Sequence, residues 1–124
     1  MGAMNNENNS QSLQLALGTV SGTATSLVGY LPKKAKLKSV KFYSAAGFAA
    51  SDTNYLVSKL KVGSAEKAIH SSKLTGGNSA IAAGVTEFAL SDKDLAQDSK
   101  LELEITETGT VSVDLHAVVE YYPL

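Results

Sequence analysis

The chain has 124 residues, enough for one domain with a core, and its 44% hydrophobic and 19% charged composition is typical of a globular protein. A formal net charge of -1, with no arginine among its eleven basic residues, argues against a protein that binds nucleic acid or a charged membrane surface. The absence of cysteine excludes disulfides and thiolate chemistry, and no apolar run approaches the roughly 18 residues of a transmembrane helix.

The N-terminal stretch MGAMNNENNSQ is polar and lacks the apolar run of a signal peptide. We expect MGAM to be a remnant of cloning ahead of a native Met4, and the polar residues after it to be disordered. The expected organisation is a cloning remnant and polar arm over residues 1–11, followed by a single β-sandwich domain over residues 12–124.

Alternation of apolar and polar residues dominates the rest of the chain and predicts β-strands. In chain order, we expect strands at residues 12–20, 23–31, 36–45, 54–62, 84–91, 100–106 and 110–124. Residues 67–75 fit either a short strand or a helix closed by Gly76 and Gly77. About eight strands separated by turn residues predict an all-β, two-sheet antiparallel sandwich that is jelly-roll-like.

Local patterns predict the segments before and after the strand at residues 100–106, and they predict which residues form the core. Ser91 with Asp94 three residues later is a capping-box arrangement, which predicts one short helical turn within residues 91–96. Gly109 suits the positive φ of a hairpin turn before the last strand. Matched alternation on either side of that turn places one apolar set in the core: Leu101, Leu103, Ile105, Val111, Val113, Leu115, Ala117 and Val119.

Two pairs of residues raise the question of catalysis. Asp114 and His116 share one strand face, about 7 Å apart along the strand, but no serine lies in a G-x-S-x-G turn to complete a triad. Glu102 and Glu104 are similarly spaced, yet the carboxylates of a glycosidase face each other across a cleft. We therefore expect no catalytic residue and no enzyme. The face of Asp114 and His116 is either a solvated surface or, since Val118 and Tyr122 share it, a subunit contact.

Metal and cofactor binding find little support. Asp92, Asp94 and Asp98 cluster within SDKDLAQD, but this segment lacks the glycine and terminal glutamate of an EF-hand loop. Acids near a helix N-terminus are the simpler reading. His70 and His116 are the only histidines, too few for a histidine zinc site. We expect no metal and no cofactor.

Charge is distributed unevenly along the sequence. Residues 33–73 hold nine lysines against Asp52 and Glu66, whereas residues 92–120 hold eight acids against Lys93 and Lys100. Three interpretations remain open. The lysines protect a sheet edge from aggregation, basic and acidic strands pair within one sheet, or the two regions meet between copies in an assembly.

Three stretches together resemble a known class of protein: KLKSVKFYSAAGFAASDTNYLVSKLKVG, then FALSDKDLAQDSKLELEIT, then VDLHAVVEYYPL. Their pattern is similar to that of head decoration (cement) proteins of tailed bacteriophages, of the small β-sandwich type, over residues 33–122. The resemblance implies a non-enzymatic capsid protein, made in the cytoplasm of the host bacterium and carried on the virion surface. It also implies a homotrimer that binds the major capsid protein. The polar arm before Leu13 is then expected to help attach the protein to the capsid.

We expect the contacts with the capsid or with other subunits to involve one basic stretch and a tyrosine near the C-terminus, namely Lys33, Lys34, Lys36, Lys38 and Tyr122. The alternative function is a receptor- or glycan-binding module at the tip of a phage tail fibre, because glycan sites present aromatic platforms. The candidate platforms are Tyr43, Tyr55, Tyr121 and Tyr122.

Overall fold

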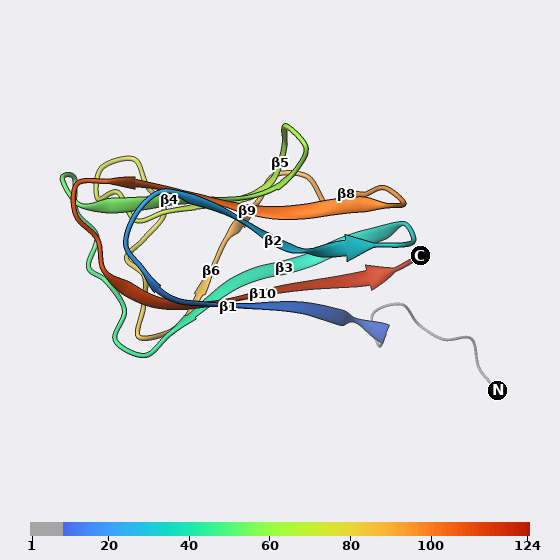
Figure 1. The fold of residues 1–124 in the computed structure, drawn as a ribbon, viewed down its shortest axis with the longest axis horizontal. Coiled ribbons are helices and arrows are strands. Elements are labelled where there is room, and N and C mark those ends of the chain that lie inside the picture. Colours follow the sequence, from blue (N-terminus) through green and yellow to red (C-terminus); the bar gives the residue numbers. More distant parts are fainter. Residues whose placement is uncertain (1–8) are drawn as a thin grey trace.

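The computed structural model describes residues 9–124, which fold into two antiparallel sheets packed face to face (Figure 1). Most of the expected polar arm lies outside the described residues, and Gln11 is already the first residue of a strand. Within residues 9–124, no helix is long and apolar enough to cross a membrane.

Each sheet is assembled from strands that are distant in sequence. Sheet A has the order β1 (Gln11–Val20), β10 (Val113–Pro123), β3 (Ala35–Ser44) and β6 (Gly84–Glu87), with β8 (Asp94–Leu95) also beside β3. Sheet B has the order β2 (Ala24–Leu31), β9 (Ser99–Thr108), β4 (Tyr55–Val62), β5 (Ala65–Ser71) and β7 (Ala89–Leu90).

The eight longer strands form a jelly roll, as expected from the sequence. Setting aside the two-residue strands β7 and β8, and numbering the others from one to eight in chain order, sheet A reads 1-8-3-6 and sheet B reads 2-7-4-5. Except from β4 to β5, each successive strand crosses to the other sheet. This arrangement turns one face of every long strand towards the space between the layers.

The predicted core is confirmed. All eight residues expected there are buried, with relative exposures between 0% for Leu101 and 4% for Val113. The rest of the core comes from strands β2 to β5 and from the segments that follow β5: Leu31, Ala35, Leu37, Val40, Phe42, Leu56, Leu60, Ala68, Ile81, Phe88 and Leu95. The polar residues between them on β9 and β10 face outwards, so the alternation identified the correct face of both strands.

The segment expected as one strand at residues 84–91 is divided between the sheets. Residues up to Glu87 pair with β3 in sheet A, whereas Ala89 and Leu90 pair with β5 in sheet B. Phe88 lies where the chain crosses between the sheets, and its amide donates to the Val40 carbonyl at 2.8 Å. Its ring packs edge-on against the Phe42 ring, with 4.8 Å between the two ring centres. The buried aromatic ring therefore fixes the corner.

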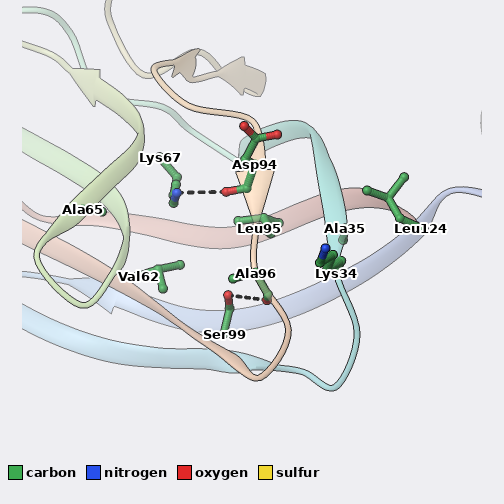
Figure 2. Close-up of a pocket in the computed structure, with 10 residues that line it drawn as sticks. All are labelled: Lys34, Ala35, Val62, Ala65, Lys67, Asp94, Leu95, Ala96, Ser99 and Leu124. Atoms are coloured by element: carbon green, nitrogen blue, oxygen red, sulfur yellow. Dashed lines mark hydrogen bonds between the residues drawn. The ribbon is translucent and has the colours of Figure 1, made fainter.

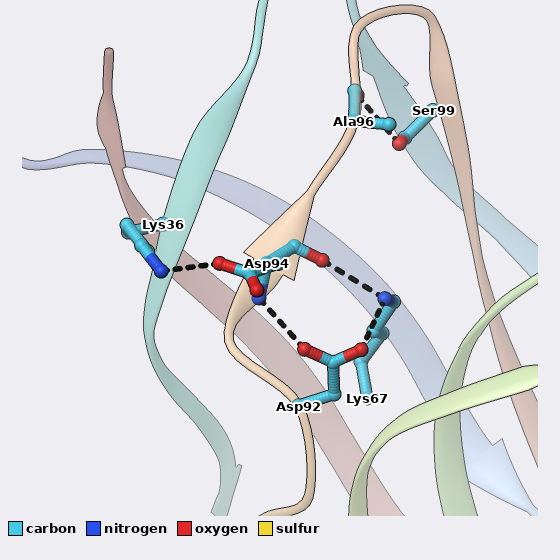
Figure 3. A network of polar contacts seen from close by, with 6 residues as sticks. All are labelled: Lys36, Lys67, Asp92, Asp94, Ala96 and Ser99. Atoms are coloured by element: carbon cyan, nitrogen blue, oxygen red, sulfur yellow. Dashed lines mark hydrogen bonds and ion pairs between the residues drawn. The ribbon is translucent and has the colours of Figure 1, made fainter.

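The helical turn predicted within residues 91–96 is wrong. Ser91 donates its hydroxyl to Glu66 instead of capping a helix, and Asp92 accepts the amide of Asp94 in a tight turn. Lys67 donates to both the Asp92 carboxylate and the Asp94 carbonyl, which holds the segment extended (Figure 3). Leu95 then inserts into the core while β8 pairs with β3. Tertiary contacts have overridden a local capping signal.

The ambiguous segment 67–75 begins as a strand and ends as a loop. Its first half belongs to β5, which pairs with β4, and residues 72–83 then cross to sheet A. Gly109 has the expected positive φ, at 72°, but the hairpin predicted there is wrong: β9 lies in sheet B and β10 in sheet A, so the segment around Gly109 crosses between the sheets. A Cβ atom at this position would lie 2.1 Å from the Thr53 carbonyl oxygen, so both the backbone angle and the close packing require glycine.

Candidate functional site

One end of the sandwich brings the predicted contact residues together. Antiparallel pairing of β10 with β3 sets Tyr122 opposite Lys36, and the amide of Leu124 donates to the Lys34 carbonyl at 3.0 Å. We call this the lysine–tyrosine surface, comprising Lys33, Lys34, Lys36, Lys38 and Tyr122. The C-terminal strand thus ends beside the basic turn between β2 and β3.

The members of this surface differ in how their charges are used. The Lys38 amine lies 5.6 Å from the centre of the Tyr122 ring, within the range of a cation–π contact. Lys36 forms an ion pair with Asp94. Lys33 and Lys34 are exposed in the turn and form no ion pair within residues 9–124. These two lysines therefore carry the charge most available to a partner.

Two hollows flank this basic turn. The larger, of about 480 Å³, opens between the sheets and is lined by Lys34, Val62, Leu95 and Leu124, among others (Figure 2). At its wall, the mostly buried Lys67 amine donates to Asp92 at 2.9 Å and to the Asp94 carbonyl at 2.8 Å. Both of these hydrogen bonds of the Lys67 amine are therefore made to acceptors within the protein.

The smaller hollow, of about 240 Å³, has walls from Gln11, Leu31, Pro32, Tyr121 and Pro123 beside the two free-standing lysines of the turn. The sequence did not indicate either hollow, because their walls come from segments far apart in the chain. Apolar recesses next to exposed cations provide the two elements of a protein-binding surface, a buried anchor and a charged rim.

Much of the uneven charge is neutralised within the molecule. Lys61 lies 3.4 Å from Glu104 across the β4–β9 pair, and Lys67 lies 2.9 Å from Asp92. Lys59 is 3.7 Å from Glu66, again on neighbouring strands. Of the three interpretations of the charge pattern, pairing of basic and acidic strands within a sheet accounts for Lys61 and Glu104, whereas Asp92 lies in the turn between β7 and β8.

Asp114 and His116 have separate structural roles. Asp114 accepts the amide of Ala45 at 2.9 Å and the Ser44 hydroxyl at 3.3 Å, and the amide hydrogen bond is the main cause that lowers its pKa. His116 instead lies 3.0 Å from the Gln14 side chain on β1. The acid therefore ties down the loop after β3, and the two residues do not form a catalytic pair.

The glutamates considered for glycoside chemistry lie along one strand face. Glu104 pairs with Lys61, and Glu102 lies 3.9 Å from Lys100. Both side chains face outwards from β9, on the surface of sheet B. No opposing acid across a cleft accompanies them in the part of the chain that the structure describes.

The acidic segment and the buried histidine have local partners. Lys67 is the main cause that lowers the pKa of Asp92, which also accepts the amide of Asp94. Among the described residues, no three His, Cys, Asp or Glu side chains are grouped to hold a metal. His70 is 1% exposed beside Phe88, its Nε2 atom lies 3.1 Å from the Ser79 hydroxyl, and its burial lowers its pKa.

Aromatic platforms are present on the outer face of sheet A. A shallow hollow of about 420 Å³ is lined by Gln14, Lys41, Tyr43, His116 and Glu120, among others. Tyr43 is 39% exposed there. Tyr55, Tyr121 and Tyr122 are only partly exposed, whereas Tyr30 on β2 is 59% exposed and was not among the predicted platforms.

No protein-family model matches the chain, and no curated protein matches it in sequence. Among solved structures, it is similar to a chain of the Cyanophage Pam1 capsid asymmetric unit, with a TM-score of 0.56 and 15% sequence identity. The match covers 94% of this chain and 86% of that chain. At this identity the likeness shows a common fold, extending over nearly the whole of both chains.

Proposed function

We propose that this chain is a non-enzymatic structural protein of a tailed bacteriophage that decorates and stabilises the capsid. The observation that carries the proposal is the agreement in fold, over 94% of this chain and 86% of the other, with a chain of a cyanophage capsid assembly. The sequence resemblance over residues 33–122 points to the same class of protein. The proposed location is the outer surface of the virion, after synthesis in the host cytoplasm.

The lysine–tyrosine surface is the proposed contact with the major capsid protein. Lys33 and Lys34 steer the approach to an acidic patch and set the orientation, since exposed charges contribute to rate and specificity more than to affinity. The hollows beside Pro32 and Leu124 accept apolar side chains, which supply most of the binding free energy. The protein acts as a homo-oligomer, for which the resemblance implies three copies.

Co-sedimentation with capsids tests this proposal. Purified protein is mixed with undecorated capsids of its own phage and pelleted, and we expect it in the pellet. The triple variant Lys33→Gln, Lys34→Gln, Lys38→Gln should bind more weakly. The matched control Lys59→Gln, Lys61→Gln, Lys73→Gln removes the same charge from sheet B and the loop after β5, and should bind normally. Wild-type protein that stays in the supernatant under all conditions would contradict the decoration role.

The second candidate function is a receptor- or glycan-binding tip of a tail fibre. The observation that favours it is the exposed Tyr43 ring in a hollow with Gln14, Lys41 and His116, which combines an aromatic platform with hydrogen-bonding groups. A glycan array and a host-cell binding assay test it. Binding that is lost in Tyr43→Ala, together with no capsid binding, would replace the decoration proposal.

A further inference from the structure

One side of the sandwich is formed by two long edge strands without charge. Strands β1 and β2 are the outer strands of sheets A and B, and they lie on the same side of the molecule (Figure 1). No Asp, Glu, Lys, Arg or His occurs from Asn9 to Pro32. Within residues 9–124, β1 pairs only with β10 and β2 only with β9, so each strand presents unpaired backbone groups outwards.

The opposite side of the sandwich is protected in the usual ways. Its outer strands are short: β6 has four residues, and β7 and β8 have two each. Charged side chains also stand along it, since Glu87 ends β6 and Asp94 of β8 is paired with Lys36. Short strands and charges are how soluble proteins prevent pairing between sheet edges. The difference between the two sides indicates that the exposed edges of β1 and β2 bind a partner.

The uncharged side is also apolar. Leu13, Leu15 and Leu17 of β1 are only partly buried against the core. Leu13 packs onto β2 so closely that a Cβ atom at Gly29 would lie 3.1 Å from its Cδ1 atom. On β2, Leu27 is 46% exposed. A partner on this side would therefore find both backbone hydrogen-bonding groups and apolar side chains.

We propose that a second copy of this chain binds this side, with its own uncharged edge against β1. A charge on the partner would be removed from water here with no opposite charge on β1 or β2 to meet it, which is costly. The partner surface must therefore be uncharged too, and the β1–β2 side itself meets that requirement. The inference rests on the homo-oligomer of the proposed function, but not on attachment to a capsid.

Sedimentation velocity over a concentration series tests the interface. The double variant Ser12→Lys, Ala16→Lys places two charges at exposed positions of β1, where Glu120 and His116 are the neighbours on β10. Like charges on facing strands repel, so self-association should weaken by about tenfold or more. The matched control Thr106→Lys, Thr108→Lys adds the same charge at exposed positions of β9, an inner strand, and should associate as the wild type does.

Amide hydrogen exchange on the wild type gives an answer even if the β1 variant misfolds. In the oligomer, the β1 amides that do not bond to β10 should be protected, and this protection should be lost on dilution to the monomer. Three results would overturn the inference: a wild type that is monomeric at all concentrations, a folded β1 variant that associates normally, or unprotected outward amides in the oligomer. Co-sedimentation of the wild type with capsids reports separately on the decoration role.

Discussion

The Lys41 amine lies 3.3 Å from a carboxylate oxygen of Glu120, across the β3–β10 pair of sheet A. The Ser39 hydroxyl donates to the same carboxylate at 2.6 Å and is the main cause that lowers the Glu120 pKa. The hydrogen bond to Glu120 is also the main cause that raises the pKa of Lys41. A lysine of the basic half and an acid of the acidic half thus neutralise each other inside one molecule, so fewer charges are left for a partner.

The salt dependence of capsid attachment should therefore come from a few residues. We expect the association rate to fall as salt rises, because exposed charges are screened over about 8 Å at physiological ionic strength. In the variant Lys33→Gln, Lys34→Gln this dependence should become shallower. Association kinetics on immobilised capsids at several salt concentrations measure it. If the association rate of that variant depended on salt concentration as steeply as that of the wild type, the charges that steer attachment would have to lie elsewhere.

Leu103→Ala should destabilise the protein strongly. Leu103 is 1% exposed at the centre of β9, and truncating a buried leucine costs about 2–5 kcal/mol through the cavity that it leaves. Glu102→Ala, on the outer face of the same strand, should cost less than about 1 kcal/mol. Urea unfolding followed by circular dichroism compares the two. Equal losses would argue against the packing described for β9.

Acid should destabilise the protein through His70. Burial lowers its folded-state pKa below the ordinary value of 6.5, so the unfolded chain takes up the proton first. The free energy of unfolding should be at its full value above about pH 6.5 and should fall as pH drops from there towards the folded-state pKa. Urea unfolding at pH 7.5 and pH 5 measures the difference, and His70→Gln should remove most of it.

The matched control for that experiment is His116→Gln, which makes the same substitution at the half-buried histidine on the outer face of sheet A. The folded-state pKa values of Asp52, Asp92 and Asp114 are lowered from 3.8, so the stability that these acids contribute is lost as pH falls from about 3.8 towards those lower values, outside this window. Retention of the full pH dependence in His70→Gln would show that another group is responsible.

Two glycine substitutions separate backbone strain from steric clash. Gly63 and Gly109 have φ values of 61° and 72°, but only at Gly109 would a Cβ atom meet neighbours, with Thr53 at 2.1 Å. Gly63→Ala should cost about 1–2 kcal/mol for the left-handed conformation alone. Gly109→Ala adds a clash of about 1–3 kcal/mol. Thermal melts of both variants test this, and Gly109→Ala should lower the melting temperature more than Gly63→Ala does.

We expect no hydrolysis by this protein. Asp114, His116, Glu102 and Glu104 are each engaged with neighbours on strand surfaces and do not converge on a cleft. A broad screen of ester and glycoside substrates is the measurement. Turnover that disappears in His116→Ala or Glu104→Gln would contradict the structural role proposed for the chain.

Sequence reasoning succeeded where one face of a strand alone decides the structure. The alternation around Gly109 identified the core residues of β9 and β10, because a slip of one residue would expose every apolar side chain. It failed at residues 91–96, where the capping signal of Ser91 is weaker than the hydrogen bonds from Lys67 and the burial of Leu95. Those contacts join segments about 25 residues apart, which no local pattern reveals.

The candidate surface was predictable only in part. Lys33 to Lys38 are adjacent in the sequence, and their grouping needed no fold. Their proximity to Tyr122 and the hollows near Leu124 depends on the pairing of β10 with β3. The pairing of Lys41 with Glu120 depends on the same register, so the sequence alone left three interpretations of the charge pattern open.

The place of β10 between β1 and β3 has a consequence for synthesis. Within residues 9–124, β1 of sheet A hydrogen-bonds only to β10, and β2 of sheet B hydrogen-bonds only to β9. Until the ribosome has translated β10, the uncharged β1 has no native strand of its own chain to pair with, so the two sheets are completed only after β10 emerges. Such late, long-range closure makes folding slow and exposes nascent chains to misassembly when many are made together.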